Sequence, residues 1–172
     1  VGVLGFVLSI FTLPRLLPKG TFKFKCGIPA LVMTRLLMMG AVTGAEVVMP
    51  LLLQRIHGWS ANTASLAVTI ATLSWASGAF IQSQFKNRRV RLLLPKIGSC
   101  MIVIGLAPLS MLLNPSLPKW PVFIAWLLSG VGVGFTHSTI SDLTLGSTDP
   151  SMHGRASSWL QVADSAGAAV EL

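Results

Sequence analysis

Long apolar segments alternate with short polar ones along the whole chain. Apolar runs extend over 28–53, 63–85, 92–113 and 121–145, and a shorter run extends from about residue 155 to the end of the sequence. Each of the four long runs reaches the roughly 20 residues that an α-helix needs to cross the hydrocarbon core of a bilayer. The pattern predicts an all-α, polytopic membrane protein, with four full membrane helices and a partial fifth within 28–172.

Both ends of the sequence are apolar. The stretch 1–13 is interpreted as the end of a preceding membrane helix, because neither an initiator Met nor a basic region comes before it, as a signal peptide would require. A basic linker follows at 14–27. The last residues are again apolar, so we expect the sequence to be part of a longer protein.

Composition supports the membrane assignment and argues against a competing class. Apolar residues make up 52% of the chain and charged residues only 10%, whereas soluble domains carry about 25% charged residues. The net charge of +8 suggests nucleic acid at first sight. The basic residues, however, lie in short bursts between apolar runs and not in a stripe on a polar surface. The predicted partner is therefore the lipid bilayer and not nucleic acid.

Basic residues cluster in alternate connections between the apolar runs. The segments 14–27 and 86–91 carry most of them, and Arg155 directly follows the segment 146–154, while the intervening connections hold only Arg55 and Lys119. Because positive residues are retained on the cytoplasmic side, the segments 14–27, 86–91 and 146–154 are predicted to be cytoplasmic.

This orientation predicts the outcome of a labelling experiment. Cysteines introduced at Asn87 and at Ser116 are expected to react from opposite sides of an intact membrane, because the two positions lie in consecutive connections. Equal labelling of both cysteines from outside would overturn the orientation.

Small residues recur at four-residue spacing inside the apolar runs. Gly40 and Gly44 form one such pair, and Gly130 and Gly134 form another within GVGVGF. This spacing lets helix backbones approach closely in a membrane. A dinucleotide-binding loop fits poorly, because the third glycine has the wrong spacing and no strand precedes it. Close helix packing is the prediction.

Two charged residues stand out in the first long run. Glu46 lies about 27 Å along a helix that begins near Ile28, and Arg35 precedes Glu46 by eleven residues. Eleven steps of roughly 100° bring both side chains to within about 20° of one helix face. A charged side chain that faces lipid costs at least a few kcal/mol, so this face is expected to meet protein or water.

The last apolar run carries a second polar face. Ser157, Gln161 and Asp164 follow the spacing i, i+4, i+7 and share one side of a helix. Asp164 would lie about 15 Å into the membrane, where a carboxyl group is a candidate for binding and releasing a proton. The alternative is an aspartate that hydrogen-bonds a neighbouring helix and serves packing alone.

The fourth long run contributes His137 and Ser141 on one face, at i and i+4. A single histidine of this kind is more often a packing group than a ligand. Three convergent metal ligands cannot be assembled from the nearby sequence, and no nucleophile has a plausible base beside it. Neither a metal, a cofactor nor enzyme activity is predicted.

A resemblance to a known family is carried by four stretches in order: RLLPKGTFKFKCGIPALVMTRLL, GAEVVMPLLLQRIHGWSANTASLAVTIATLSWASGAFIQSQF, GVGVGFTHSTISDL and PSMHGRASSWLQVADSAGAAV. They resemble the second half of a bacterial major facilitator superfamily transporter of the multidrug-efflux type. The resemblance covers essentially the whole chain and implies a partial six-helix half of that fold. A loop motif of the family has a counterpart that begins at Gly78, but Gln82 stands where the family has an acidic residue.

The resemblance implies a secondary active transporter, multi-pass in the inner (plasma) membrane, that exports a small or amphipathic solute by proton-coupled alternating access. In such transporters the seventh and tenth helices line a central cavity, and the eighth and eleventh lie between the two halves. Arg35, Glu46 and His137 are then cavity candidates, Asp164 lies near the interface between the halves, and Gln161 is a further candidate for the substrate or proton pathway. The implied partners are the solute, protons and a missing N-terminal half.

A non-transporting membrane receptor or structural subunit, whose helices only pack, is the alternative. A channel would need a continuous polar ring, whereas these runs offer single polar residues. The sequence before residue 1 would discriminate between the two classes: six spans with the same spacing favour a transporter, and a soluble sensor domain favours a receptor.

Overall fold

The protein is described by a computed structural model over residues 12–114 and 120–169, and within these ranges it is helical, without strands. A helical turn at 12–16 comes first. The elements that follow, in chain order, are η1 (Thr21–Lys23), α2 (Ile28–Arg55), α3 (Ala61–Gln84), α4 (Arg88–Leu106), η2 (Ala107–Leu113), α5 (Pro121–Gly146), η3 (Pro150–Met152) and α6 (His153–Ala169).

Four helices are long and apolar enough to cross a membrane. They are α2, α3, α5 and the continuous stretch Arg88–Ser110, which begins with α4. This confirms the all-α, polytopic fold class, with four candidate membrane-spanning helices. The predicted end of a preceding helix at 1–13 and the labelling position Ser116 fall largely or wholly outside the described residues.

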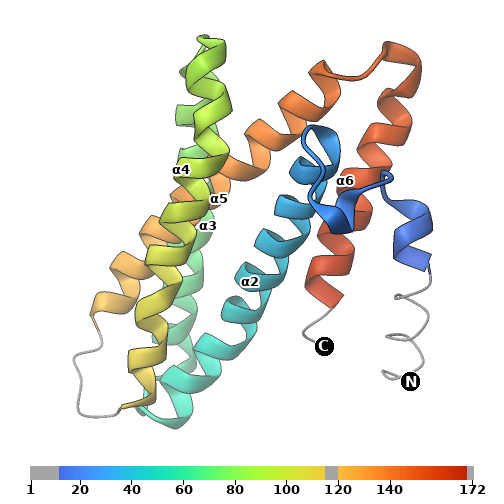
Figure 1. Cartoon of the computed structure of the whole chain (residues 1–172). Coiled ribbons are helices and arrows are strands. Elements are labelled where there is room, and N and C mark those ends of the chain that lie inside the picture. The colour runs from blue at the N-terminus through green and yellow to red at the C-terminus, as the bar shows by residue number, and fades with distance from the viewer. Residues whose placement is uncertain (1–11, 115–119, 170–172) are drawn as a thin grey trace. The chain divides into compact units, whose positions relative to one another are not determined.

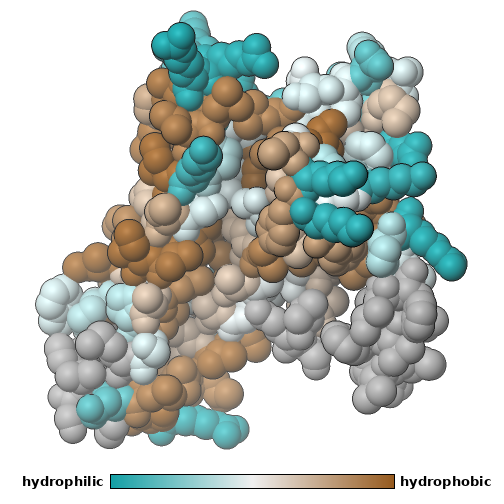
Figure 2. All heavy atoms as spheres, viewed as in Figure 1, coloured by the Kyte–Doolittle hydropathy of each residue, from teal (hydrophilic) through white to brown (hydrophobic). Residues whose placement is uncertain are grey.

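The start of α4 differs from the prediction, which placed 86–91 in a loop. The side chain of Asn87 accepts a hydrogen bond from the backbone N–H of Arg89 at 2.9 Å, so the helix begins at Arg88 and includes Arg91. An asparagine in this position satisfies one of the N–H groups that a helix start leaves without a partner. Figure 2 shows hydrophilic side chains at this end of α4 and hydrophobic ones along its length.

The chain forms two compact units, of which the second comprises residues 45–139. It contains the end of α2, all of α3 and α4, and most of α5, and Figure 1 shows α3 and α4 side by side with α5 crossing them obliquely. The core of this unit consists of Met49, Leu53, Ala64, Ala67, Ala71, Val122 and Trp126.

Glycines bring α5 into backbone contact with both neighbours in this unit. A Cβ on Gly134 would lie 2.5 Å from the carbonyl oxygen of Trp75 in α3, and a Cβ on Gly132 would lie 2.6 Å from that of Gly98 in α4. The close packing predicted for the GVGVGF stretch is confirmed.

The first unit comprises, within the described residues, 12–44 and 140–169. The beginning of α2, the end of α5 and α6 meet there around Leu17, Val32, Ile140, Leu160 and Ala163. A Cβ on Gly40 of α2 would lie 3.3 Å from the carbonyl oxygen of Gly167 in α6, so these two helices also approach closely. This contact confirms a packing role for Gly40.

Candidate functional site

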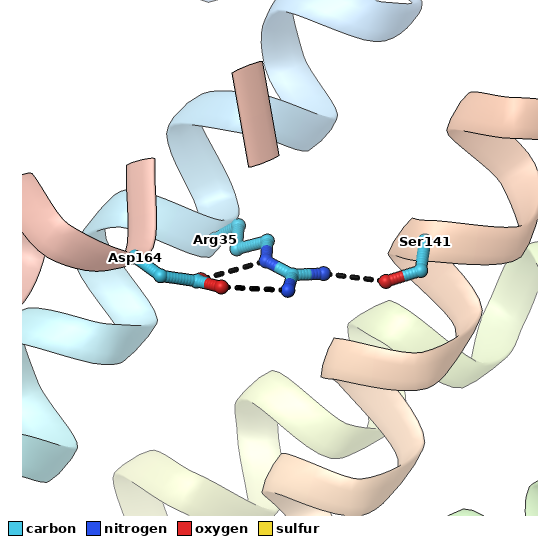
Figure 3. A network of polar contacts seen from close by, with 3 residues as sticks. All are labelled: Arg35, Ser141 and Asp164. Atoms are coloured by element: carbon cyan, nitrogen blue, oxygen red, sulfur yellow. Dashed lines mark hydrogen bonds and ion pairs between the residues drawn. The ribbon is translucent and has the colours of Figure 1, made fainter. Parts of the chain in front are cut away.

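An ion pair joins the helices α2 and α6 within the first unit. The Arg35 guanidinium in α2 donates from Nε to Oδ1 of Asp164 and from one terminal nitrogen to Oδ2, both at 2.7 Å. Its other terminal nitrogen donates to the hydroxyl of Ser141 at 2.6 Å. Arg35 therefore links α2, α5 and α6 through three hydrogen bonds (Figure 3). We call these three residues the Arg35 network.

The sequence of α6 explains why Asp164 points toward α2. Small and apolar residues of α6 form its buried face, namely Ala156, Leu160, Ala163 and Gly167. Asp164 follows Ala163 directly, so its side chain projects at the edge of this buried face. The close contact between Gly40 and Gly167 brings the two backbones together within two turns of the ion pair. The Asp164 carboxylate can therefore reach the Arg35 guanidinium and accept two hydrogen bonds from it, which is a bidentate contact.

The two partners differ in their access to solvent. The Arg35 side chain is 6% exposed, whereas the Asp164 side chain is 24% exposed. A buried guanidinium needs a counter-charge, because burying an isolated charge costs several kcal/mol. The two parallel N–H···O bonds supply that counter-charge in the strongest geometry available to a carboxylate. The carboxylate, in contrast, remains partly exposed at the surface of this unit.

The pairing places the Asp164 carboxylate beside the Arg35 guanidinium. Arg35 lies seven residues beyond Ile28, or about 10 Å along α2 at 1.5 Å per residue. The depth of about 15 Å expected for Asp164 within the membrane stays a prediction.

Glu46 lies in the part of α2 that belongs to the second unit, and its side chain is half-buried. Within the described ranges its carboxylate has no hydrogen-bond or ion-pair partner. Pro50 lies one turn further along α2 and has no N–H, so the Glu46 carbonyl also loses its usual helical donor. The carboxylate is thus left for solvent or a solute, which keeps Glu46 a candidate.

Substitution of Glu46 by Gln is expected to spare folding and to lower transport or change its substrate range. The amide keeps the shape and most of the hydrogen-bonding capacity of the carboxylate but loses its charge. Transport assays of the variant beside Asp149→Asn, an exposed loop aspartate, check this. Unchanged transport of every solute by Glu46→Gln would reduce Glu46 to a packing residue.

The structure places the other two predicted residues elsewhere. His137 is half-buried, and its ring contacts the edge of Trp75 with the centroids 5.3 Å apart. Gln161 is exposed and lines an open groove together with Thr12, Leu13, Ser158, Val162, Ser165 and Ala166. Asp164 does not line that groove, so the polar face predicted for the last run divides between two environments. Ser141, predicted only as a neighbour of His137 on one helix face, is the residue that completes the Arg35 network.

Sequence reasoning singled out Arg35 and Asp164 separately and missed their pairing. The two residues are 129 positions apart, and helical periodicity relates only residues on the same helix. The one available signal was that charged residues inside membranes usually pair with one another. Among the described residues no group of three His, Cys, Asp or Glu side chains lies in a metal-binding arrangement.

Comparison with known proteins gives one match. The model of a protein family described as Major Facilitator Superfamily matches residues 2–170, which is nearly the entire chain. Comparisons with curated proteins and with solved structures found no match.

Proposed function

Since the chain belongs to the Major Facilitator Superfamily, whose members are membrane transporters, we propose that it exports a small or amphipathic solute in exchange for protons. We place it in the inner (plasma) membrane, working by alternating access together with a further, N-terminal set of helices, as the resemblance to multidrug-efflux transporters implies. The observation that carries this proposal is the Arg35 network, which ties three helices together through one ionisable carboxylate.

The chemistry of the Arg35 network suits a proton-dependent switch. An ionised Asp164 holds Arg35 by a charge-assisted, two-pronged contact. Protonation removes the negative charge and converts one acceptor oxygen into a donor that faces a cation. The contact between α2 and α6 is then weakened while Arg35 still contacts Ser141 of α5. One proton therefore changes which helices are tied together, as an alternating-access cycle requires of its coupling group.

Transport assays on the complete transporter test the proposal. In inverted membrane vesicles that expel an amphipathic dye such as ethidium, Asp164→Asn is expected to abolish efflux driven by a pH gradient while downhill dye movement persists. Asp164→Glu keeps an ionisable carboxyl group and is expected to retain part of the pH dependence.

A second variant separates coupling from folding. Arg35→Gln together with Asp164→Asn removes both charges, so no buried charge is left without a partner. The double variant is expected to insert normally and to remain uncoupled. Full proton-driven export by the double variant would show that the pair is a structural tether and that the coupling group lies elsewhere.

A further inference from the structure

The connection between the helical turn at 12–16 and α2 is a compact turn. The Thr21 hydroxyl donates to the carbonyl of Pro18 at 2.7 Å, and the backbone N–H groups of Lys23 and Lys25 donate to the carbonyl of Gly20 at 3.0 and 3.2 Å. Thr21 is 1% exposed and anchors the turn. The segment 18–25, which we call the basic turn, therefore presents its remaining side chains from an ordered backbone.

The basic turn directs large apolar side chains outward. Phe22 is 48% exposed and Phe24 is 54% exposed. Phe24 has a φ of 48°, a left-handed conformation that bulky residues rarely adopt. Strained backbone of this kind persists where the surrounding structure enforces it, and it concentrates at functional positions. Two phenyl rings are thus held away from the protein interior.

The same turn carries uncompensated positive charge. Lys19, Lys23 and Lys25 alternate with the phenylalanines, and the first acidic residue of the whole sequence is Glu46. Within the described ranges none of the three lysines forms an ion pair. Figure 2 shows hydrophilic side chains gathered over this segment, which Figure 1 draws in blue. The missing counter-charge must be supplied by another molecule or by solvent ions.

The position of the turn identifies that molecule. The membrane helix α2 begins at Ile28, three residues after Lys25, so the turn lies where the chain enters the bilayer. A surface at that level meets lipid headgroups. Alternating basic and aromatic side chains match such a surface, because cations attract anionic headgroups and apolar rings enter the boundary between headgroups and acyl chains.

We propose that the basic turn is a docking site for anionic phospholipid, in which Phe22 and Phe24 insert at the headgroup boundary and the three lysines contact lipid phosphates. The ordered backbone lowers the entropic cost of docking, because the side chains are already presented together. The proposal depends on α2 crossing the membrane and not on the transported solute or on proton coupling. Its test is therefore independent of the proposed function.

The native cysteine beside the turn makes the proposal testable. Cys26 is exposed and free, so it can carry an environment-sensitive fluorophore once Cys100 and every cysteine outside residues 1–172 are replaced by serine. The complete protein is reconstituted in phosphatidylcholine vesicles with or without phosphatidylglycerol. With the anionic lipid we expect blue-shifted emission and quenching by lipids that carry a nitroxide near the headgroup.

Substitutions within the turn are expected to reverse this signal. Phe22→Ser with Phe24→Ser should remove the blue shift. Neutralising each lysine to Gln should lower the equilibrium constant for docking roughly fivefold and weaken its dependence on salt. The matched control is Phe85→Ser with Lys86→Gln, an exposed phenylalanine and lysine that follow α3, which should leave the Cys26 probe unchanged.

Three results would overturn the proposal. A probe that aqueous iodide quenches equally in both kinds of vesicle would show that the turn stays in water. A blue shift produced by inorganic phosphate in phosphatidylcholine vesicles would indicate a site for small anions. A blue-shifted probe that neither aqueous iodide nor nitroxide lipids quench would show that protein, and not lipid, covers the two rings.

Discussion

Substitution of Asp164 by Asn is expected to destabilise the protein by about 3–5 kcal/mol, because it leaves a buried guanidinium without its counter-charge. The Arg35 side chain is 6% exposed and cannot regain water without displacing α6. The reverse substitution, Arg35→Gln, is expected to cost less, since the partly exposed carboxylate can be hydrated or take up a proton. Unfolding in detergent by increasing denaturant measures both effects.

The double variant Arg35→Gln with Asp164→Asn completes a thermodynamic cycle. It is expected to recover much of the stability lost in Asp164→Asn, because no unpaired charge remains. Ser141→Ala is the matched control and should cost only about 1.5–3 kcal/mol, the contribution of one hydrogen bond to a charged group. If the two single effects add to within about 0.5 kcal/mol, the residues do not interact, and the geometry of the pair is wrong.

Replacement of Gly134 by Ala is expected to destabilise the second unit by about 3 kcal/mol. The new Cβ would lie 2.5 Å from both the Ala79 nitrogen and the Trp75 carbonyl oxygen of α3. These are backbone atoms, so no rotamer change can relieve the overlap, and overpacking of this kind costs up to about 3 kcal/mol. A lower melting temperature of the purified protein in detergent is the expected result.

The same helix offers the control for this substitution. A Cβ on Gly146 would meet no heavy atom within 4 Å, so Gly146→Ala should leave stability unchanged or raise it by up to about 1 kcal/mol, as alanine is the better helix former. A loss of stability equal to that of Gly134→Ala would show that glycine matters here for the backbone and not for close contact.

The membrane helices were predictable because each is marked by a local property, a long apolar run. The start of α4 was not, since Arg88, Arg89 and Arg91 in a first turn oppose the helix dipole and resemble a loop. Only the cap provided by Asn87 signals a helix there. Small-residue spacing predicted close packing at Gly134, but it did not predict which helices would be the partners.

The Arg35 network was only half predictable. That Arg35 and Asp164 should avoid lipid follows from the cost of charge in a membrane. Their pairing depends on how α2 and α6 pack in the first unit, where Gly40 meets Gly167. This contact joins distant parts of the sequence, and the periodicity of residues within one helix does not indicate which other helix it contacts.

The separation of 129 residues between Arg35 and Asp164 has a consequence for biosynthesis. At a synthesis rate of about 5–20 residues per second, Asp164 is made roughly 6–26 s after Arg35. During that interval α2 holds an arginine whose permanent counter-charge does not yet exist. Because Arg35 lies only about 10 Å from the start of α2, its long side chain can reach back to the headgroups. The helix can thus enter the bilayer with its cation still hydrated, before the Asp164 carboxylate is there to pair with it.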